Sequence, residues 1–303
     1  MRNAFIDELV IAAESNNKIA LMVGDLGYGV VEPFADKFPN QFFNAGVAEQ
    51  NMMGMAAGLA SEGFHVFVYS IANFPTFRCA EQIRNDVDYH KLPVTIVSIG
   101  GGLAYGNLGY SHHALQDYAL MRILPNLLIA APGDPMETRA CMRYLINHPQ
   151  PSYLRLGKAG EPCMHPAVPI IEPGKWLEVL RPENAKSTVL TTGCTLDMCH
   201  SLLSELASKN EYALHSLPLW GMQQKRFQPP QINKWRQIIT VEDHLIDAGF
   251  GSWLLEAWNA DNERSSEKLI HTRGLSPDVC GLVGKQSTLN AFGGLTKENI
   301  LPK

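Results

Sequence analysis

The sequence predicts an α/β protein made of two doubly wound domains, each built on a mainly parallel sheet. Short apolar runs of strand length alternate with segments of helical periodicity, and the runs carry few polar residues. Such strands, with helices between them, indicate a parallel sheet covered on both faces. A proline-rich stretch over residues 160–173 interrupts the alternation, which then begins again. We therefore expect one domain over residues 1–165 and a second over residues 166–303.

The first half of the chain opens with a helix and continues with six strands. Apolar residues recur at helical spacing over residues 3–15, and two asparagines end that pattern. The expected strands cover residues 19–23, 42–43, 65–71, 93–99, 127–131 and 152–156. The other expected helices lie between Gly46 and Gly63 and over residues 76–88, 115–123 and 135–147. Asp134 before Pro135 is typical of a helix start, because the carboxylate accepts hydrogen bonds from free N–H groups.

The second half repeats the alternation on a smaller scale. Its expected strands cover residues 188–192, 213–217, 237–241 and 268–271, and its expected helices cover residues 195–208 and 249–260. With 303 residues, the chain is long enough to give each half a core of its own.

Composition excludes several classes of function. A net charge of −5 provides no basic surface for nucleic acid, so no nucleic-acid partner is expected. No apolar run has the length of a membrane span, and acids near the first residue replace the apolar centre of a signal peptide, which predicts a cytoplasmic protein. The six cysteines lack the paired spacing of a zinc site, and reduced thiols are expected.

The stretch around Glu49 is the most informative part of the sequence. Glu49 stands at the head of a helix in which the next acid is Glu62. A carboxylate there either complements the positive end of the helix dipole or serves a function, and the stretch alone leaves both interpretations open. Gly54 and Gly58, with alanines beside them, leave one helix face almost without side chains. Such a face suits a close neighbour in another subunit.

The segment Gly46-Val47-Ala48-Glu49-Gln50-Asn51, with the small-residue helix behind it, resembles a segment of transketolases and 1-deoxyxylulose-5-phosphate synthases. In that family the segment supplies the glutamate that touches thiamine diphosphate. The resemblance extends from Arg2 to about Lys158 and more loosely to the C-terminus, where residues 240–244 and 249–252 also match. It implies a pyrimidine-binding domain followed by a transketolase C-terminal-type domain.

The resemblance assigns roles to several residues near the cofactor. Glu49 takes the place of the carboxyl group that hydrogen-bonds the pyrimidine ring, and a partly apolar site would keep it protonatable near neutral pH. Phe77, and after it Phe74, would present an aromatic face to that ring, although either could belong to an ordinary core. Asp25 follows a strand and could face the ligand or stabilise a turn.

The loop Gly106–His113 is similar to the family's Gly-Glu-Asp-Gly-Pro-Thr-His-Gln. His112 takes the place of the substrate-binding histidine, which makes it the second candidate catalytic residue after Glu49, and His113 is a further substrate-binding candidate. Leu108 stands where the family has an aspartate that reads a sugar hydroxyl. The resemblance thus implies a substrate site that lacks a polar contact.

Two further positions depart from the family in the same direction. The family's phosphate-binding histidine corresponds to a position near Gly100. Lys158 stands where the family has an arginine, so a single ammonium charge replaces a guanidinium that can donate two hydrogen bonds to one phosphate. Arg2, Arg155 or the partner chain could supply other anion contacts. Lys158 is equally well explained as a solvated charge at the end of a strand. A substrate held like an ordinary sugar phosphate is therefore not expected.

The sequence contains no Gly-Asp-Gly, the motif that begins the family's Mg²⁺ site. The resemblance therefore implies a subunit of a split enzyme that transfers a two-carbon ketol unit between sugar-type substrates. Mg²⁺ ligands would lie on a separate N-terminal diphosphate-binding subunit, in a heterotetramer with two copies of each chain. The alternatives are a decarboxylating synthase-like or 2-oxo acid dehydrogenase β-type subunit acting on a keto substrate, and a non-catalytic scaffold. A scaffold needs neither Glu49 nor His112.

Overall fold

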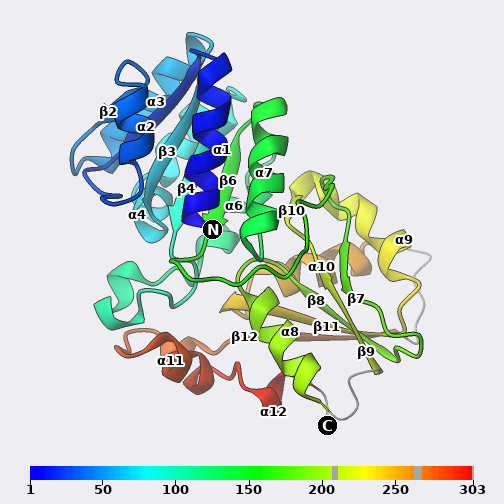
Figure 1. Ribbon diagram of the computed structural model, residues 1–303. Helices are drawn as coiled ribbons and strands as arrows, with labels where there is room; N and C mark the ends of the chain where they lie inside the picture. Colours follow the sequence, from blue (N-terminus) through cyan, green and yellow to red (C-terminus); the bar gives the residue numbers. More distant parts are fainter. Residues whose placement is uncertain (207–210, 262–267, 302–303) are drawn as a thin grey trace.

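The computed structural model describes residues 1–206, 211–261 and 268–301, which form two sheets covered by helices (Figure 1). The first sheet has the order β10-β5-β6-β4-β3-β1-β2, and every neighbouring pair is parallel except β10 with β5. Its strands are β1 (Ile19–Val23), β2 (Phe42–Asn44), β3 (His65–Ile71), β4 (Val94–Ile99), β5 (Leu128–Ala130), β6 (Ser152–Leu156) and β10 (Leu219–Gly221).

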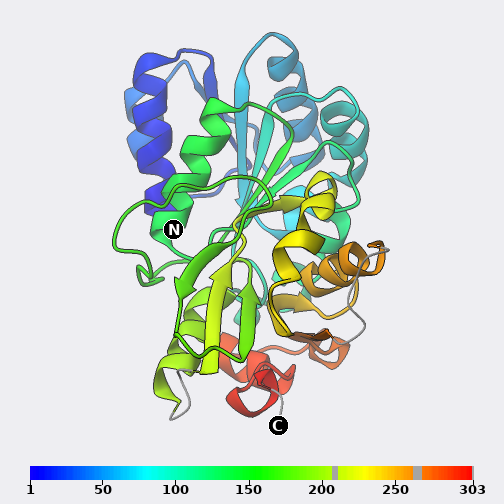
Figure 2. The same cartoon turned by 90° about the vertical axis from the view of Figure 1, so that its right-hand side faces the viewer.

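The second sheet has the order β12-β11-β8-β9-β7, in which β7 alone runs antiparallel to its neighbour. Its strands are β7 (Leu177–Leu180), β8 (Ser187–Thr191), β9 (Tyr212–Ser216), β11 (Gln237–Leu245) and β12 (Leu269–Leu275). Figure 2 shows this sheet below the first one. Two mainly parallel sheets with helices packed on them confirm the predicted α/β doubly wound fold.

Helices cover both faces of the first sheet because its strands are apolar on both sides. One core contains side chains of α1 (Arg2–Ser15), α2 (Glu32–Lys37) and α7 (Pro135–Asn147), and α1 and α7 lie side by side (Figure 1). The other core contains side chains of α3 (Glu49–Ser61) and α6 (Asp117–Met121). As predicted, the Asp134 carboxylate accepts from the N–H of Glu137 at the start of α7.

The segment over residues 73–88 differs from the single helix expected at 76–88. It begins earlier and consists of α4 (Asn73–Phe77), α5 (Ala80–Gln82) and a π-helical stretch, Ile83–Asp88. The glycine-rich loop contains two short 3-10 turns, Gly106–Leu108 and Tyr110–His112. Such short turns and π-helical stretches are frequent near functional sites, and periodicity in the sequence does not reveal them.

The second half contains further elements that the sequence did not predict, namely β7, β10, α9 (Gln228–Ile232), α11 (Gln286–Phe292) and α12 (Lys297–Ile300). The predicted helices correspond to α8 (Thr195–Glu205) and α10 (Phe250–Asn259). The last two residues of the helix expected at 195–208 lie outside the described residues. No helix in the described ranges combines the length and apolar character that a membrane crossing requires.

The two halves share a core, because β10 from the second half completes the first sheet. The fully buried Trp220 of β10 contacts Tyr118, Phe250 and Trp253 through their rings. Its indole N–H also donates to the Thr192 hydroxyl. The domain boundary at residue 165 stays a proposal, and any version of it must let β10 cross back to the first sheet.

Candidate active site

The residues that the sequence singles out follow the carboxyl ends of neighbouring parallel strands. Glu49 comes after β2, Phe74 after β3, the glycine-rich loop with His112 after β4, and Lys158 after β6. Strands β6, β4, β3, β1 and β2 are consecutive neighbours in the sheet. Ligands bind at this edge in open α/β sheets, so the topology gathers these side chains where a site is expected.

Glu49 is the first residue of α3, and its side chain is only 4% exposed. The chain reaches it through Gly46, whose φ of +71° lies in the left-handed region that glycine tolerates. The Glu49 carboxylate oxygen Oε1 accepts a hydrogen bond of 2.8 Å from Nη1 of Arg78, and the two residues form an ion pair. A nearly buried carboxylate is thus paired with an arginine that the sequence analysis did not select.

Arg78 connects Glu49 to the aromatic part of the site. Its guanidinium carbon lies 4.6 Å from the centre of the Phe74 ring, which is a cation–π distance. Another neighbour of Phe74 is His112, whose ring meets it edge-on at 5.0 Å between centroids. Of the two phenylalanines, Phe74 is therefore the one in contact with other site residues, whereas Phe77 is 48% exposed.

His112 lies at the end of the second 3-10 turn of the glycine-rich loop and is half-buried. Its Nδ1 is 3.0 Å from the Ser111 hydroxyl, and the Asn73 amide donates to the Ser111 carbonyl, which ties the loop to α4. The Tyr105 ring lies 6.4 Å from the His112 ring, and Lys158 Nζ lies 5.0 Å from the centre of the Tyr105 ring. Contacts therefore run without a break from Glu49 to Lys158.

Tyr105 fills the volume in which a counterpart of the family's phosphate-binding histidine would lie. A Cβ added at Gly100 would lie 2.2 Å from the Tyr105 ring, and the φ of Gly100 is +82°. A side chain at position 100 would therefore displace that ring and strain the backbone. Burial raises the pKa of the Tyr105 phenol. An aromatic ring from the loop that follows β4 therefore occupies the space beside Gly100.

Lys158 is exposed and lines a small cavity of 210 Å³ at the ends of β4 and β6. Gly101 and Gly157 form part of its wall, and Glu161 and Asp197 place two acids beside the lysine. The Glu161 carboxylate is paired with the N-terminal ammonium at 3.0 Å, so two acids and two cations balance around this cavity, and an anion would not find a strongly positive cavity in this chain alone.

Asp25 is part of a turn beside the entrance to α3. Its carboxylate accepts from the Asn44 amide and the Tyr28 hydroxyl, and these two hydrogen bonds lower its pKa. Asn44 Oδ1 in turn accepts from the N–H groups of Asp25 and Gly46. These contacts agree with the turn interpretation of Asp25, and its contact with a cofactor stays a prediction. Leu108 is 49% exposed on the glycine-rich loop, where a substrate can reach it.

The structure gives Arg155 a different role from the predicted substrate contact. Its side chain is 1% exposed, and its Nε and Nη1 donate to Asp117 and Asp243 at 2.6 Å each. Nη2 donates to the carbonyl of Ala114, which follows the His112 loop. Arg155 therefore holds the loop and joins the two halves of the chain, and a substrate cannot reach its guanidinium.

His113 also differs from the expected substrate ligand. Its ring is 1% exposed, with Nε2 3.3 Å from the Gly106 carbonyl oxygen, and burial lowers its pKa. This neutral ring stabilises the loop from inside. The neighbouring His112 is the histidine that faces the other site residues.

Two residues of this site, Arg78 and Tyr105, were not selected from the sequence. Arg78 directly follows the phenylalanine pair, and Tyr105 lies within the glycine-rich loop after β4. A charged residue after an aromatic pair and an aromatic residue in a glycine-rich loop are weak signals. Only the contacts seen in the folded chain identify Arg78 and Tyr105 as site residues.

The donor set fits one half of thiamine diphosphate. One nearly buried carboxyl and an aromatic ring suit the planar aminopyrimidine. Within the described ranges, no group of three or more His, Cys, Asp and Glu side chains could hold a metal ion. This chain therefore offers contacts for the pyrimidine ring and, in its described part, no cluster for the Mg²⁺ that binds a diphosphate.

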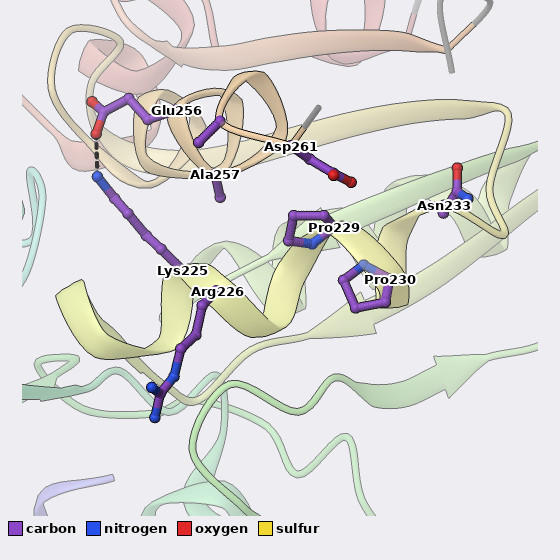
Figure 3. A pocket seen from close by; sticks show the side chains of 9 residues that line it. Lys225, Arg226, Pro229, Pro230, Asn233, Glu256, Ala257 and Asp261 are labelled. Carbon is purple, nitrogen blue, oxygen red and sulfur yellow. Dashed lines mark hydrogen bonds and ion pairs between the residues drawn. The ribbon is translucent and has the colours of Figure 1, made fainter. Parts of the chain in front are cut away.

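A larger pocket, of 760 Å³, lies between α9 and α10, away from these residues (Figure 3). It is lined by Lys225, Arg226, Pro229, Pro230, Asn233, Glu256, Ala257, Ala260 and Asp261. Lys225 and Glu256 form an ion pair across one end of it. None of the residues that line this pocket was selected from the sequence, and we assign it no function.

Comparisons with known proteins identify the family of this chain. The model of the transketolase pyrimidine-binding domain matches residues 1–160. The chain is 32% identical to the putative transketolase C-terminal section of Methanocaldococcus jannaschii, over 99% of this chain and 93% of that protein. It is 30% identical to one of the subunits of the apulose-4-phosphate transketolase of Phocaeicola vulgatus, over 99% of this chain and 94% of that subunit.

Longer proteins and a solved structure match as well. The chain is 31% identical to the 1-deoxy-D-xylulose-5-phosphate synthase of Pelotomaculum thermopropionicum, over 96% of this chain, and it spans about half of that protein, 45%. A structure described as a split gene transketolase, inactive beta4 tetramer, superimposes with a TM-score of 0.82 at 28% identity, covering 99% of this chain and 94% of that one.

Proposed function

This chain belongs to the transketolase family, and from that premise we propose that it is the C-terminal subunit of a thiamine-diphosphate-dependent transferase. It would transfer a two-carbon ketol unit between sugar-type substrates. The observation that carries the proposal is the nearly buried Glu49 carboxyl, linked through Arg78 to Phe74 and His112. These are the groups that the chemistry requires from a pyrimidine-binding chain.

Each of these residues has a part in the proposed mechanism. Glu49 would hydrogen-bond the pyrimidine nitrogen and share a proton with it, and the ring of Phe74 or Phe77 would stack on the pyrimidine. His112 would hydrogen-bond an oxygen of the substrate. When bound, thiamine diphosphate supplies the carbon nucleophile that the protein's own side chains lack. The protein's contribution is therefore to orient the reactants and to control one proton.

The proposal places the remaining contacts on a second kind of chain. Exposed apolar side chains flank Glu49, among them Val47, Met55 and Phe77. On the same helix a Cβ added at Gly54 or Gly58 would meet no atom within 4 Å, so another backbone has room to approach closely. Relatives of similar length are named as a C-terminal section or as one subunit of a transketolase. We propose a diphosphate-binding partner that supplies the Mg²⁺ ligands, in a heterotetramer with two copies of each chain.

The substrate is proposed to lack a hydroxyl where Leu108 lies, or to present an apolar group there. A hydroxyl pressed against Leu108 would lose its water without a replacement hydrogen bond. Lys158 could still contact one negative charge, although Asp197 lines the same cavity and weakens its field.

A decarboxylating synthase is the second candidate, because the chain is 31% identical to about half of such an enzyme. The two candidates differ in their donor. A ketol transferase uses a ketose and releases no carbon dioxide, whereas a synthase uses a 2-oxo acid and does.

The test is reconstitution with a transketolase-like chain from the same organism that carries the Gly-Asp-Gly motif. The proposal predicts that neither chain alone transfers a ketol unit and that the mixture does so when thiamine diphosphate and Mg²⁺ are present. A panel of ketoses and pyruvate, with carbon dioxide measured, separates the two candidates. A mixture that forms a stable complex and turns over no donor would favour the scaffold alternative.

A further inference from the structure

Arg78 contacts both of the side chains, Glu49 and Phe74, that are proposed to hold the aminopyrimidine. Its Nη1 donates to the Glu49 carboxylate at 2.8 Å, and its guanidinium carbon lies 4.6 Å from the centre of the Phe74 ring. A guanidinium is planar, carries N–H donors at its edge and stacks on aromatic rings. A protonated aminopyrimidine has the same three properties. Arg78 therefore makes the same two interactions that the ring would make, a hydrogen bond to the Glu49 carboxylate and stacking on the Phe74 ring.

The two occupants require different protonation states of Glu49. An ion pair with Arg78 requires Glu49 to be an ionised carboxylate. Because Glu49 is nearly buried, an ionised carboxylate without a positive partner would raise the free energy of the protein. A hydrogen bond in which Glu49 shares a proton with the pyrimidine nitrogen requires that proton to be present. Exchange of Arg78 for the ring therefore changes the number of bound protons.

We propose that Arg78 is a positioning residue, which holds Glu49 as a carboxylate against Phe74 until the aminopyrimidine of thiamine diphosphate replaces its guanidinium. This inference rests on the proposed function. During the exchange Glu49 takes up about one proton from the solvent, and Arg78 turns outward. Its side chain is already 48% exposed, so the displaced charge does not have to cross a buried region.

The surroundings of Glu49 identify it as the group that changes its protonation. Helix α3 packs against β1, β3, β4, α4, α5 and the π-helical stretch. From these neighbours the titratable groups that the structure places against Glu49 are Arg78 and Cys79. Burial, and after it the charge of Glu49, raises the pKa of the Cys79 thiol to about 12, so this thiol stays neutral. A guanidinium does not lose its proton in proteins.

The test uses the assembled enzyme and measures cofactor binding rather than turnover. Isothermal titration with thiamine diphosphate and Mg²⁺, in buffers of different ionisation enthalpy, gives both the affinity and the protons taken up. Wild type is expected to take up about one proton per site more than Arg78→Met, because the variant lacks the guanidinium that holds the buried Glu49 as a carboxylate. Arg78→Met should also bind about twofold to fivefold more tightly, because no ion pair has to be broken.

Arg78→Lys is the matched variant, since it keeps the charge next to Glu49 and loses the planar fork. It should retain the proton uptake of the wild type. Equal proton uptake by wild type and Arg78→Met would overturn the proposal. Weaker cofactor binding by Arg78→Met, with unchanged proton uptake, would also overturn it, because Arg78 would then support the bound state.

A second measurement needs this chain alone. With ¹³C in the glutamate side-chain carboxyls, and Glu49→Gln to assign the signal, the Glu49 resonance at pH 7 should have the carboxylate position in wild type. In Arg78→Met it should move toward the protonated position, and an unmoved signal contradicts the proposal. An assembled enzyme that binds no cofactor would refute the proposed function, whereas unchanged carboxyl signals would refute only the role of Arg78.

Discussion

At the scale of single residues, Glu49 is the group on which the proposed chemistry depends. Its carboxyl is nearly buried at the start of α3, and the arginine that faces it is half-exposed. The carboxyl of Glu49 is thus held in place, whereas a cofactor could displace the arginine that pairs with it. A residue that only complemented the helix dipole would need neither burial nor an arginine.

Replacement of Glu49 by glutamine tests this role directly. Glu49→Gln should leave the fold and the assembly intact, because the amide has the same shape, and should lower kcat by about 10²–10⁴-fold, because an amide cannot share the proton. Steady-state kinetics of the reconstituted enzyme would measure the effect. Glu62→Gln is the control, since Glu62 is exposed at the other end of the same helix. Near-normal turnover by Glu49→Gln would remove Glu49 from the mechanism.

Leu108 is expected to determine which sugars are accepted. Leu108→Asp should raise kcat/KM for common sugar phosphates relative to the best wild-type donor by about 5- to 100-fold, because a carboxylate can hydrogen-bond a hydroxyl that leucine leaves unpaired. Leu269→Asp, at an exposed leucine of β12, controls for the added charge. If xylulose 5-phosphate is already the best wild-type donor, the argument from Leu108 is wrong. A second substitution to histidine at Gly100 is not useful, because Tyr105 fills that space.

At the scale of elements, the strands of the first half and the longer helices were predictable, including the three-residue strands β2 and β5, whereas several short elements of the second half were not. The five apolar residues of β1 and the capped helix α7 were predicted within a residue of their observed bounds. Strands β7 and β10 have four and three residues, too few for alternation to be recognised in the sequence. Their stability comes from the sheets that they join, and a sequence pattern does not reveal such partners.

Some residues of the candidate site could also be predicted from the sequence, and others could not. Glu49 and His112 could be selected because a motif surrounds each of them. Arg155 was misassigned because one arginine at a strand end looks like another, and only the fold shows that Asp243, 88 residues away in the sequence, neutralises it. Arg78 was missed for the opposite reason, since an arginine in the turn after a short helix is usually a solvated charge.

The buried pairs of Arg155 should contribute strongly to stability. Arg155→Met leaves the carboxylates of Asp117 and Asp243 buried without their partner, and we expect the free energy of unfolding to fall by about 3–5 kcal/mol. Arg181→Met is the matched control, because Arg181 is exposed and pairs with Glu178 at 3.6 Å, so its loss should cost under about 1 kcal/mol. Urea denaturation measures both. Equal effects of the two substitutions would contradict the structural role given to Arg155.

A second contact between the halves should respond to acid. Arg122 follows α6 and donates two hydrogen bonds to Glu256 of α10, and this pairing lowers the pKa of Glu256 to about 2. A lowered pKa stabilises the folded state above the unfolded value of about 4.5, and this contribution is lost as the pH falls toward 2. Glu256→Gln should therefore be less stable than wild type at pH 6, and the difference should shrink below pH 4. A difference that stays constant between pH 6 and pH 3 would show that the pair does not titrate in this way.

At the scale of the whole molecule, the proposed function implies that the chain provides half of a catalytic site. Its described residues gather a carboxyl, an aromatic ring and a histidine at one edge of the first sheet, and they contain no cluster for a metal ion. Glu49 begins α3 at this edge, Val47 beside it is exposed, and the bare face of α3 runs back from the edge along the helix. A partner that docked there would cover apolar surface and complete the cofactor site at once.

The central claim is that this chain binds the pyrimidine part of thiamine diphosphate and needs another chain for the diphosphate. The most direct test is a calorimetric titration of thiamine diphosphate and Mg²⁺ into this chain alone and into the chain assembled with its partner. We expect no measurable binding to the isolated chain and Mg²⁺-dependent binding, one cofactor per pair of chains, to the assembly. Tight, Mg²⁺-dependent binding by the isolated chain, or no binding by the assembly, would contradict the claim.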